Sequence, residues 1–266
     1  MVELRRMADT GSRRGLVNYA HQDDYYVIGL VESGSGRGFI DFQQVDVTAG
    51  DLFVIQPGQV HRFVDSNAVD GWLLIAGGEL VGDADKAVFD EFALYGSSLK
   101  VDDCRREELG QVAGLLDRRL CRLEETSSPT TMKLAETFIG IVAETVQSAS
   151  LNCPNHSRRR TEIVMAFKRL LSEHLKSSRQ ASFYAGRLNV STVYLNEVVK
   201  DVTGLGTSDC IKNETILQAK RLLVNTNLSV KEIAYSLGID DCAYFSRLFV
   251  RTVGESPSEF RQRYLD

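Results

Sequence analysis

The sequence predicts a two-domain α+β protein, in which an N-terminal β-barrel or jelly roll with a helical hairpin precedes an all-α domain. In the all-α domain, two helix-turn-helix units are joined by a linker helix. Three observations predict this fold: short strand-like runs between residues 25 and 80, apolar residues at helical spacing from residue 84 onward, and a two-helix pattern that occurs twice, 50 residues apart. The expected boundaries are 1–100 for the barrel, 101–150 for the hairpin, 151–160 for a linker and 161–266 for the all-α domain.

The composition is that of a globular protein. The chain has 266 residues, of which 43% are hydrophobic and 25% charged, and this length is sufficient for two separate cores. The first fifteen residues are polar and basic with no apolar run behind them, so we expect neither a signal peptide nor a membrane span. The five cysteines are scattered and lack CxxC spacing, which argues against a disulfide framework or a zinc site and favours a cytoplasmic location.

Charge is distributed unevenly along the chain. The net charge is −5, but from Arg158 onward 17 Lys and Arg oppose 12 Asp and Glu, a net charge of +5. The preceding residues hold 14 basic and 24 acidic side chains, a net charge of −10. This asymmetry favours a nucleic-acid-binding module attached to a module with another task.

The predicted strands of the barrel are separated by glycines and by Asp, Asn and Ser clusters, including SGSGRG at 33–38. They are Tyr25–Val31, Gly38–Phe42, Asp51–Gln56, Arg62–Val64 and Trp72–Ala76. Four side chains on or beside these strands are candidates to line an effector pocket, with strand register deciding which of them face inward. They are Arg37, His61, Arg62 and Trp72.

Residues 50–61 resemble the second conserved motif of the cupins, a Gly-Asp before a strand followed by Pro-Gly-x-x-His. The resemblance implies that His61 faces the barrel interior. Metal-binding cupins combine this histidine with an earlier His-x-His and a Glu, and no His-x-His occurs at the matching place. The remaining histidines are His21, His156 and His174. Because one ligand does not make a metal site, we expect no metal and no cofactor, and we interpret His61 as a pocket or core residue.

Two amphipathic helices are predicted after the barrel, on either side of the Ser127-Ser128-Pro129 break. The hairpin either only covers the open side of the barrel or also contacts a second subunit. We favour a homodimer, because repeated or palindromic DNA sites reward two-fold symmetry. The candidate contact residues are Leu109, Val112, Leu116, Leu120 and Leu123.

Two helix-turn-helix units follow. In the first, Ser182–Leu188, with Ser182 as a possible N-cap, precedes a second helix over Thr192–Thr203 that ends at Gly204. In the second, a short helix around Ile233 ends at Gly238 and precedes a helix from Cys242 to Val253. A connecting helix over 208–225 separates the units, and Ser229 with Glu232 forms a capping-box signature. The connecting helix would be about 27 Å long, which suits recognition helices one DNA turn apart.

This arrangement resembles the DNA-binding domain of the AraC/XylS family of bacterial transcription regulators, over roughly residues 160–266. The resemblance implies a cupin-like effector domain in the first half and contact with RNA polymerase. Ile239 and Val250 depart from the family pattern, where Phe and Lys are common, and the loss of a lysine leads us to expect weaker anchoring by the second unit. The matching residues are Ala185, Leu188, Ser191, Leu195, Lys200, Gly204, Ala219, Leu222, Leu223, Ile233, Ala234, Gly238, Tyr244, Phe245, Ser246, Arg247, Phe249, Gly254, Pro257 and Arg261.

Helical spacing selects the side chains that would contact double-stranded DNA. Arg247 suits guanine, Asn196 adenine, Glu197 cytosine, and Val193 and Ala243 a thymine methyl. Ser246 shares the face of Arg247, while Lys200 and Arg251 are expected on phosphates. Two alternatives remain: an intramolecular ion pair for Arg247, and a solvated Glu197 or one paired with Lys200.

The predicted function is that of a sequence-specific transcription regulator controlled by a small effector in the barrel, and not that of an enzyme. Two alternatives remain from other classes. One is a cupin-type metal-dependent enzyme fused to a DNA-binding domain. The other is a regulator that responds to a protein partner through the same barrel without a small ligand.

Overall fold

The computed structural model describes residues 1–8, 19–122, 128–151 and 158–265. The chain divides into two compact units, Met1–Pro154 and Asn155–Asp266, which we call the barrel unit and the helical unit. The division falls inside the predicted linker, most of which lies outside the described residues. Each unit is described by itself.

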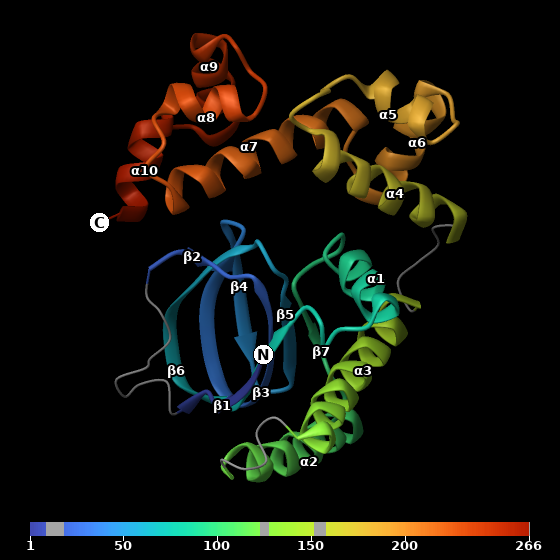
Figure 1. Ribbon diagram of the computed structural model, residues 1–266, viewed down its shortest axis with the longest axis vertical. Helices are drawn as coiled ribbons and strands as arrows, with labels where there is room; N and C mark the ends of the chain where they lie inside the picture. Colours follow the sequence, from blue (N-terminus) through green and yellow to red (C-terminus); the bar gives the residue numbers. More distant parts are fainter. Residues whose placement is uncertain (9–18, 123–127, 152–157, 266) are drawn as a thin grey trace. The chain divides into compact units, whose positions relative to one another are not determined.

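The barrel unit is built on one antiparallel sheet (Figure 1). Its strands follow the order β1-β6-β3-β5-β7, with β2 added to β6 and β4 added to β3. The bounds are β1 Val2–Arg6, β2 His21–Gln22, β3 Tyr25–Ile40, β4 Gln43–Thr48, β5 Asp51–Ile55, β6 Val60–Gly77 and β7 Ser98–Lys100.

The two long strands correct the prediction of several short ones. Residues 25–31 and 38–42 were expected as separate strands, but β3 runs through the glycine-rich segment between them. The predicted strands 62–64 and 72–76 likewise belong to β6. The ladder between β3 and β6 shifts register three times, so the irregular segment bends the paired strands without ending them.

The sheet packs on both faces, because side chains alternate along each strand. One face carries Ile28, Leu30 and Leu74, which join the helices of the unit in one apolar core. The other face carries Val27, Phe53 and Leu73, which form a second core inside the curve of the sheet. At Gly29 a Cβ atom would lie 2.1 Å from the Phe53 ring, so a glycine is needed for this aromatic side chain to cross the strand.

Three helices cover the first of these faces: α1 Asp83–Phe92, α2 Asp103–Leu120 and α3 Pro129–Leu151. The predicted hairpin corresponds to α2 and α3, while α1 and β7 were not resolved as separate elements by the sequence pattern. The Asp102 side chain accepts a hydrogen bond from the Arg105 backbone amide and caps α2.

The candidate dimer stripe on α2 is largely used inside its own unit. Leu109 and Leu116 are fully buried in the core, and Val112 and Leu120 pack partly buried against it. Leu123 lies outside the described residues. A contact with a second subunit through Leu109 or Leu116 would therefore require the hairpin to leave the sheet.

The helical unit contains two short helix pairs connected by one long helix (Figure 1). The bounds are α4 Arg158–His174, α5 Ala181–Arg187, α6 Thr192–Thr203, α7 Thr207–Asn225, α8 Val230–Ser236, α9 Cys242–Val253 and α10 Pro257–Leu265. The predicted bounds of α6 and α9 are confirmed, as is the capping box at Ser229 and Glu232. Ser182 is not an N-cap, because α5 begins one residue earlier and Gln180 occupies that position.

The two helix pairs are also joined directly, away from α7. The Arg179 guanidinium donates to the backbone carbonyls of Leu237 and Gly238 at the end of α8. Gly238 has a φ of 72°, and a Cβ atom there would lie 2.2 Å from the Lys176 carbonyl oxygen. The segment after α4 therefore packs tightly against the turn of the second pair, which fixes the second pair relative to the first.

Arg261 on α10 joins that helix to the C-terminal end of α7 and the loop that follows it. Its guanidinium donates to the carbonyls of Leu223, at 3.0 Å, and Leu228. These carbonyls lie near the C-terminal end of α7, where backbone oxygens lack helical partners.

In the described part of the chain, no helix combines the length and the apolarity that crossing a membrane requires.

Candidate nucleic-acid interface and barrel pocket

The helices α6 and α9 are each two-faced, and their inner faces form the cores of the two pairs. Leu195, Val198 and Val199 on α6 are buried, as are Phe245, Leu248 and Phe249 on α9. Both helices are capped at their N-termini by a side chain, since Ser191 accepts from the Tyr194 amide and Asp241 from the Tyr244 amide. Because the inner faces are buried, the outer faces are fixed toward solvent.

The outer face of α9 is exposed and carries two cations. Ala243, Arg247 and Arg251 are exposed on it. The Arg247 side chain lies 3.9 Å from the Asp241 carboxylate, but 71% of its surface is exposed. Such an exposed pair contributes little to stability, so the guanidinium can leave Asp241 for another partner. Ser246 is half-buried, and its hydroxyl donates to the Cys242 carbonyl at 3.0 Å.

The outer face of α6 has a different character. Val193 is 70% exposed, and Glu197 and Lys200 are also exposed. The hydrogen bond from Arg160 to Asp201, at 2.7 Å, raises the pKa of that guanidinium, and Glu197 adds to the effect. Arg160, one of three arginines at the start of α4, thus neutralises acidic groups of α6.

Asn196 is exposed, but its carboxamide already has an internal partner. Its Oδ1 atom accepts a hydrogen bond from the Thr207 backbone amide at 3.0 Å. This bond satisfies one of the unpaired amides at the N-terminus of α7. Paired recognition of adenine requires the same oxygen as acceptor, so the bond competes with the role predicted for Asn196.

Two exposed aromatic side chains on or near these helices were not among the predicted DNA contacts. Tyr235 on α8 is 74% exposed and Tyr244 on α9 is 49% exposed. Helical spacing could have indicated the exposure of Tyr235, because it lies on the polar side of a helix whose apolar positions are Ile233, Ala234 and Leu237.

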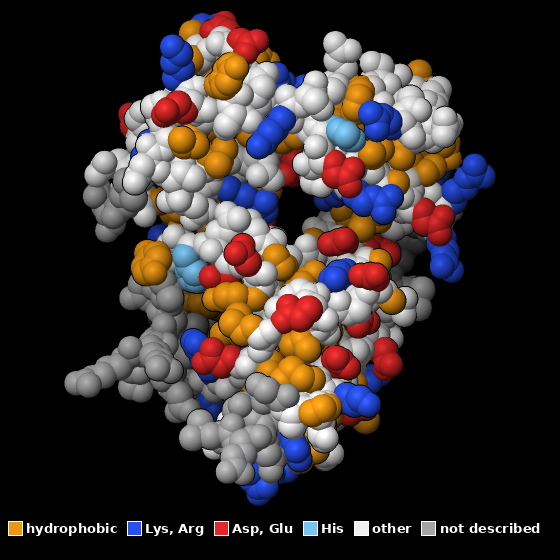
Figure 2. Space-filling model, in the orientation of Figure 1, with side chains coloured by type: hydrophobic (Ala, Val, Ile, Leu, Met, Phe, Trp, Pro, Cys, Tyr) orange, Lys and Arg blue, Asp and Glu red, His pale blue; other side chains and the backbone are white. Residues whose placement is uncertain are grey.

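On the face of the helical unit drawn in Figure 2, basic and acidic side chains are interspersed and do not form one patch.

The barrel unit contains an apolar pocket inside the curve of the sheet. Arg37, His61 and Arg62 line it, as does the Phe53 ring. Arg37 is bonded to Asp46 at 2.7 Å, and the Arg62 guanidinium stacks over Phe39 at 4.9 Å. The cavity volume is about 40 Å³, far below the several hundred Å³ of pockets that hold drug-sized ligands.

Trp72 lies on the other face of the sheet, contrary to its prediction as a pocket residue. It belongs to the core that faces the helices. Its indole N–H donates to Glu32 at 3.0 Å, and the Arg6 guanidinium stacks on its ring at 4.5 Å. One residue of register decides this, because neighbouring strand residues point to opposite faces.

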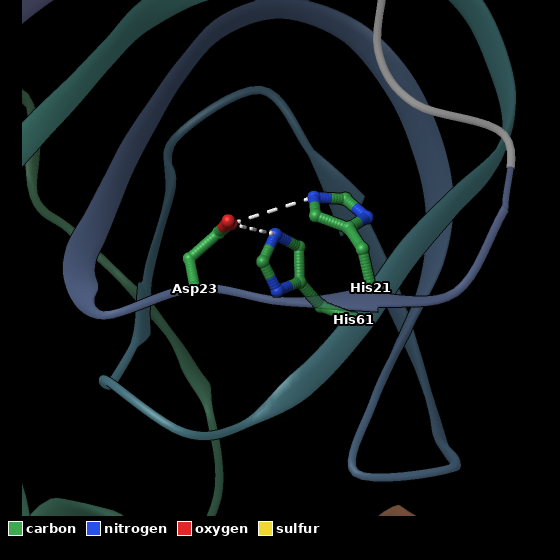
Figure 3. Close-up of side chains that lie close together, drawn as sticks. All are labelled: His21, Asp23 and His61. Atoms are coloured by element: carbon green, nitrogen blue, oxygen red, sulfur yellow. Dashed lines mark ion pairs between the residues drawn. The ribbon is translucent and has the colours of Figure 1, made fainter. Parts of the chain in front are cut away.

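His61 has two neighbours that the sequence did not associate with it. His21 is its cross-strand partner on β2, and Asp23 follows that strand. The Asp23 Oδ2 atom lies 3.4 Å from His21 Nε2 and 3.5 Å from His61 Nε2 (Figure 3). We call these three residues the His–Asp–His cluster. Burial, and secondly the neighbouring His21, lowers the pKa of His61, whose side chain is only 4% exposed.

The expectation of no metal took His61 as the single possible ligand, whereas ligand atoms of His21, Asp23 and His61 lie within 4.8 Å of one another. His156 lies outside the described residues. His21 and Asp23 are separated from His61 by about forty residues, so only the strand pairing brings them together.

Comparisons with known proteins address both units. Residues 184–263 match the family model described as a helix-turn-helix domain, and residues 13–142 match the one described as an AraC-like ligand binding domain. The Msm operon regulatory protein of Streptococcus mutans is 25% identical over 244 residues, covering 90% of this chain and 84% of that protein. The HTH-type transcriptional activator RhaS of Escherichia coli is 22% identical over 253 residues, covering 91% and 87%. The structure of ToxT from Vibrio cholerae aligns with a TM-score of 0.49 at 12% identity, covering 98% of this chain and 97% of that one.

Proposed function

Because the chain belongs to the AraC/XylS family of transcription regulators, we propose that it reads a specific double-stranded DNA site with α6 and α9 under the control of a small effector in the barrel. The observation that carries this proposal is the pair of exposed helix faces, each fixed by a buried opposite face. Two such helices on one rigid unit suit two successive segments of major groove.

The two helices contribute differently. On α9, Arg247 is placed to donate to guanine and Arg251 to phosphate, with Ala243 and Ser246 beside them. On α6, Val193 contacts a thymine methyl, Glu197 accepts from cytosine and Lys200 contacts phosphate. α9 exposes two cations, Arg247 and Arg251, whereas α6 exposes Lys200 beside Glu197, so we assign the larger electrostatic share of affinity to α9. The weaker anchoring expected from Val250 opposes this assignment and stays a prediction.

The effector acts through the apolar pocket. An organic molecule exceeds the present cavity of about 40 Å³, so its binding requires the lining side chains to move. Such a movement gives bound and unbound barrels different structures, which is the condition for an effector to change another property of the protein. Arg37, His61 and Arg62 are the polar groups at this pocket that would orient it.

Two partners complete the proposal: a second copy of the chain and RNA polymerase. For the second copy, the exposed Leu115 and the half-buried Val112 and Leu120 leave an apolar strip on α2. Sedimentation of the full-length protein and of Leu115→Glu tests this contact. A homodimer that Leu115→Glu converts to a monomer supports it, and an unchanged dimer excludes this strip.

A selection of random DNA duplexes by the full-length protein tests the main proposal. We expect recovery of one motif with two short recognition segments about 10 base pairs apart. The same selection with Arg247→Ala should lose preference at one position of that motif. Recovery of no motif by the folded protein would refute sequence-specific reading.

A further inference from the structure

The His–Asp–His cluster presents three ligand atoms to one point between β2 and β6 (Figure 3). From this geometry we propose that His21, Asp23 and His61 bind a divalent transition-metal ion. Imidazole nitrogens and a carboxylate oxygen are ligands that zinc and ferrous iron both accept. The proposal concerns metal binding by the barrel unit and does not depend on DNA binding.

The separations within the cluster fit the proposed ion. Metal–ligand bonds of about 2.0–2.1 Å at tetrahedral angles place neighbouring ligand atoms about 3.4 Å apart. Asp23 Oδ2 lies 3.4 and 3.5 Å from the two Nε2 atoms. All three atoms lie within 4.8 Å of one another, so small side-chain rotations suffice to complete the third edge.

Hydrogen bonds already select the tautomer that a metal requires. His21 Nδ1 lies 3.1 Å from the Tyr19 carbonyl oxygen, and His61 Nδ1 lies 3.3 Å from that of Gln59. A carbonyl oxygen only accepts, so these contacts favour the tautomer that has its proton on Nδ1 and its lone pair on Nε2. Both Nε2 atoms face the Asp23 carboxylate. In that tautomer a cation between the three atoms would be coordinated by all of them, and the Nδ1 bonds would supply the outer support typical of metal-binding histidines.

Asp23 is held in place from its other side. The Tyr25 hydroxyl donates a hydrogen bond to the Asp23 carboxylate. An outer-shell bond to a ligating carboxylate is the kind of contact whose loss costs about 10–100-fold in metal affinity.

Three protein ligands leave at least one coordination position open. His61 also lines the apolar pocket, so the proposed ion lies at the boundary of that pocket. The ion would give a mostly apolar cavity a strong attachment point for an anionic or oxygen-bearing ligand. This use of the open position follows from the metal site and is not needed for it.

Zinc binding to the full-length protein tests the proposal. The accessible thiols are first alkylated, because Cys104 and Cys121 are exposed and a cysteine thiolate is itself a zinc ligand. Competition with a chromophoric chelator then gives stoichiometry and affinity. We expect one zinc ion per chain, a loss of more than about 100-fold in Asp23→Asn and His61→Gln, and a loss of about 10-fold in Tyr25→Phe.

Matched controls distinguish the cluster from other ligands and from misfolding. Asp24→Asn removes the exposed carboxylate next to Asp23, and His174→Ala removes a histidine of the helical unit. Both should bind zinc as the parent does. Thermal unfolding without metal checks that each variant is folded. If His61→Gln does not fold, the zinc affinity of Asp23→Asn, which keeps the side-chain shape, decides the test. Equal affinity in Asp23→Asn and Asp24→Asn, or no stoichiometric zinc in the folded parent, would overturn the proposal.

Discussion

At the scale of single residues, Arg247 is the side chain whose loss should change specificity. We predict that Arg247→Ala weakens binding to the selected site by about 1–3 kcal/mol and relaxes preference at one base pair. The reason is that its exposed guanidinium can donate two parallel bonds to guanine. Fluorescence anisotropy with duplexes substituted at each position measures both effects, and an equal loss on all duplexes would make Arg247 a phosphate contact.

Lys200 should behave differently, because a phosphate contact carries no sequence information. We predict that Lys200→Ala weakens binding on all duplexes and lowers the slope of log affinity against log salt by about one. A salt titration of both proteins on one duplex measures this slope. An unchanged slope removes Lys200 from the interface.

Side-chain exposure was predictable at this scale, whereas side-chain partners were not. Helical spacing correctly assigned Val193 and Arg247 to the outside, because burial follows the helical period. It could not show that Asn196 bonds the Thr207 amide, since that bond depends on how α6 and α7 meet. It also could not join His21 to His61, because strand pairing is a long-range property.

At the scale of elements, the turn after α8 tests how tightly the two helix pairs are joined. We predict that Gly238→Ala destabilises the helical unit more than Gly254→Ala does. Both glycines have positive φ, so alanine costs about 1–2 kcal/mol at either position. Only at Gly238 does the added Cβ also meet a backbone atom, the Lys176 carbonyl oxygen, while nothing lies within 4 Å of it at Gly254. Urea unfolding of the two variants gives the comparison, and equal losses would contradict the close packing.

The capping box of α8 makes a prediction about pH. Its bonds from Ser229 lower the pKa of Glu232, so the capping contribution is present above the ordinary pKa of a glutamate and is lost as pH falls through the lowered value. In Ser229→Ala we expect the pKa of Glu232 to rise toward its ordinary value. NMR titration of the Glu232 side chain in the parent and in Ser229→Ala measures this pKa. The same lowered pKa in both proteins would show that a group other than the Ser229 hydroxyl lowers it.

Elements with local signals were predicted best. The bounds of α6 and α9 follow from a cap, an apolar period and a terminal glycine, all of which are local. The strands β3 and β6 were each divided in the prediction, because glycines and polar residues that usually end a strand here occur within bent ones. The face on which Trp72 lies stayed open for the related reason that register depends on the partner strand.

At the scale of the whole molecule, the helical unit should be independent. We predict that a fragment covering Asn155–Asp266 folds alone and discriminates between duplexes as the full chain does, because it has its own core and both recognition helices. Circular dichroism and the anisotropy assay test this. An unfolded fragment, or a folded one without discrimination, would show that the barrel unit is needed for reading.

The bonds of Arg179 and the packing at Gly238 have a consequence for the DNA that this protein can use. A flexible connection between two readers tolerates variable spacing, whereas these contacts fix the distance and the rotation between α6 and α9. Each base pair inserted between the two recognised segments turns one of them by about 34° around the duplex axis. Binding should therefore depend on the rotational spacing of the two segments as well as on their base sequence. A single base pair inserted between them should abolish specific binding even when every recognised base is unchanged.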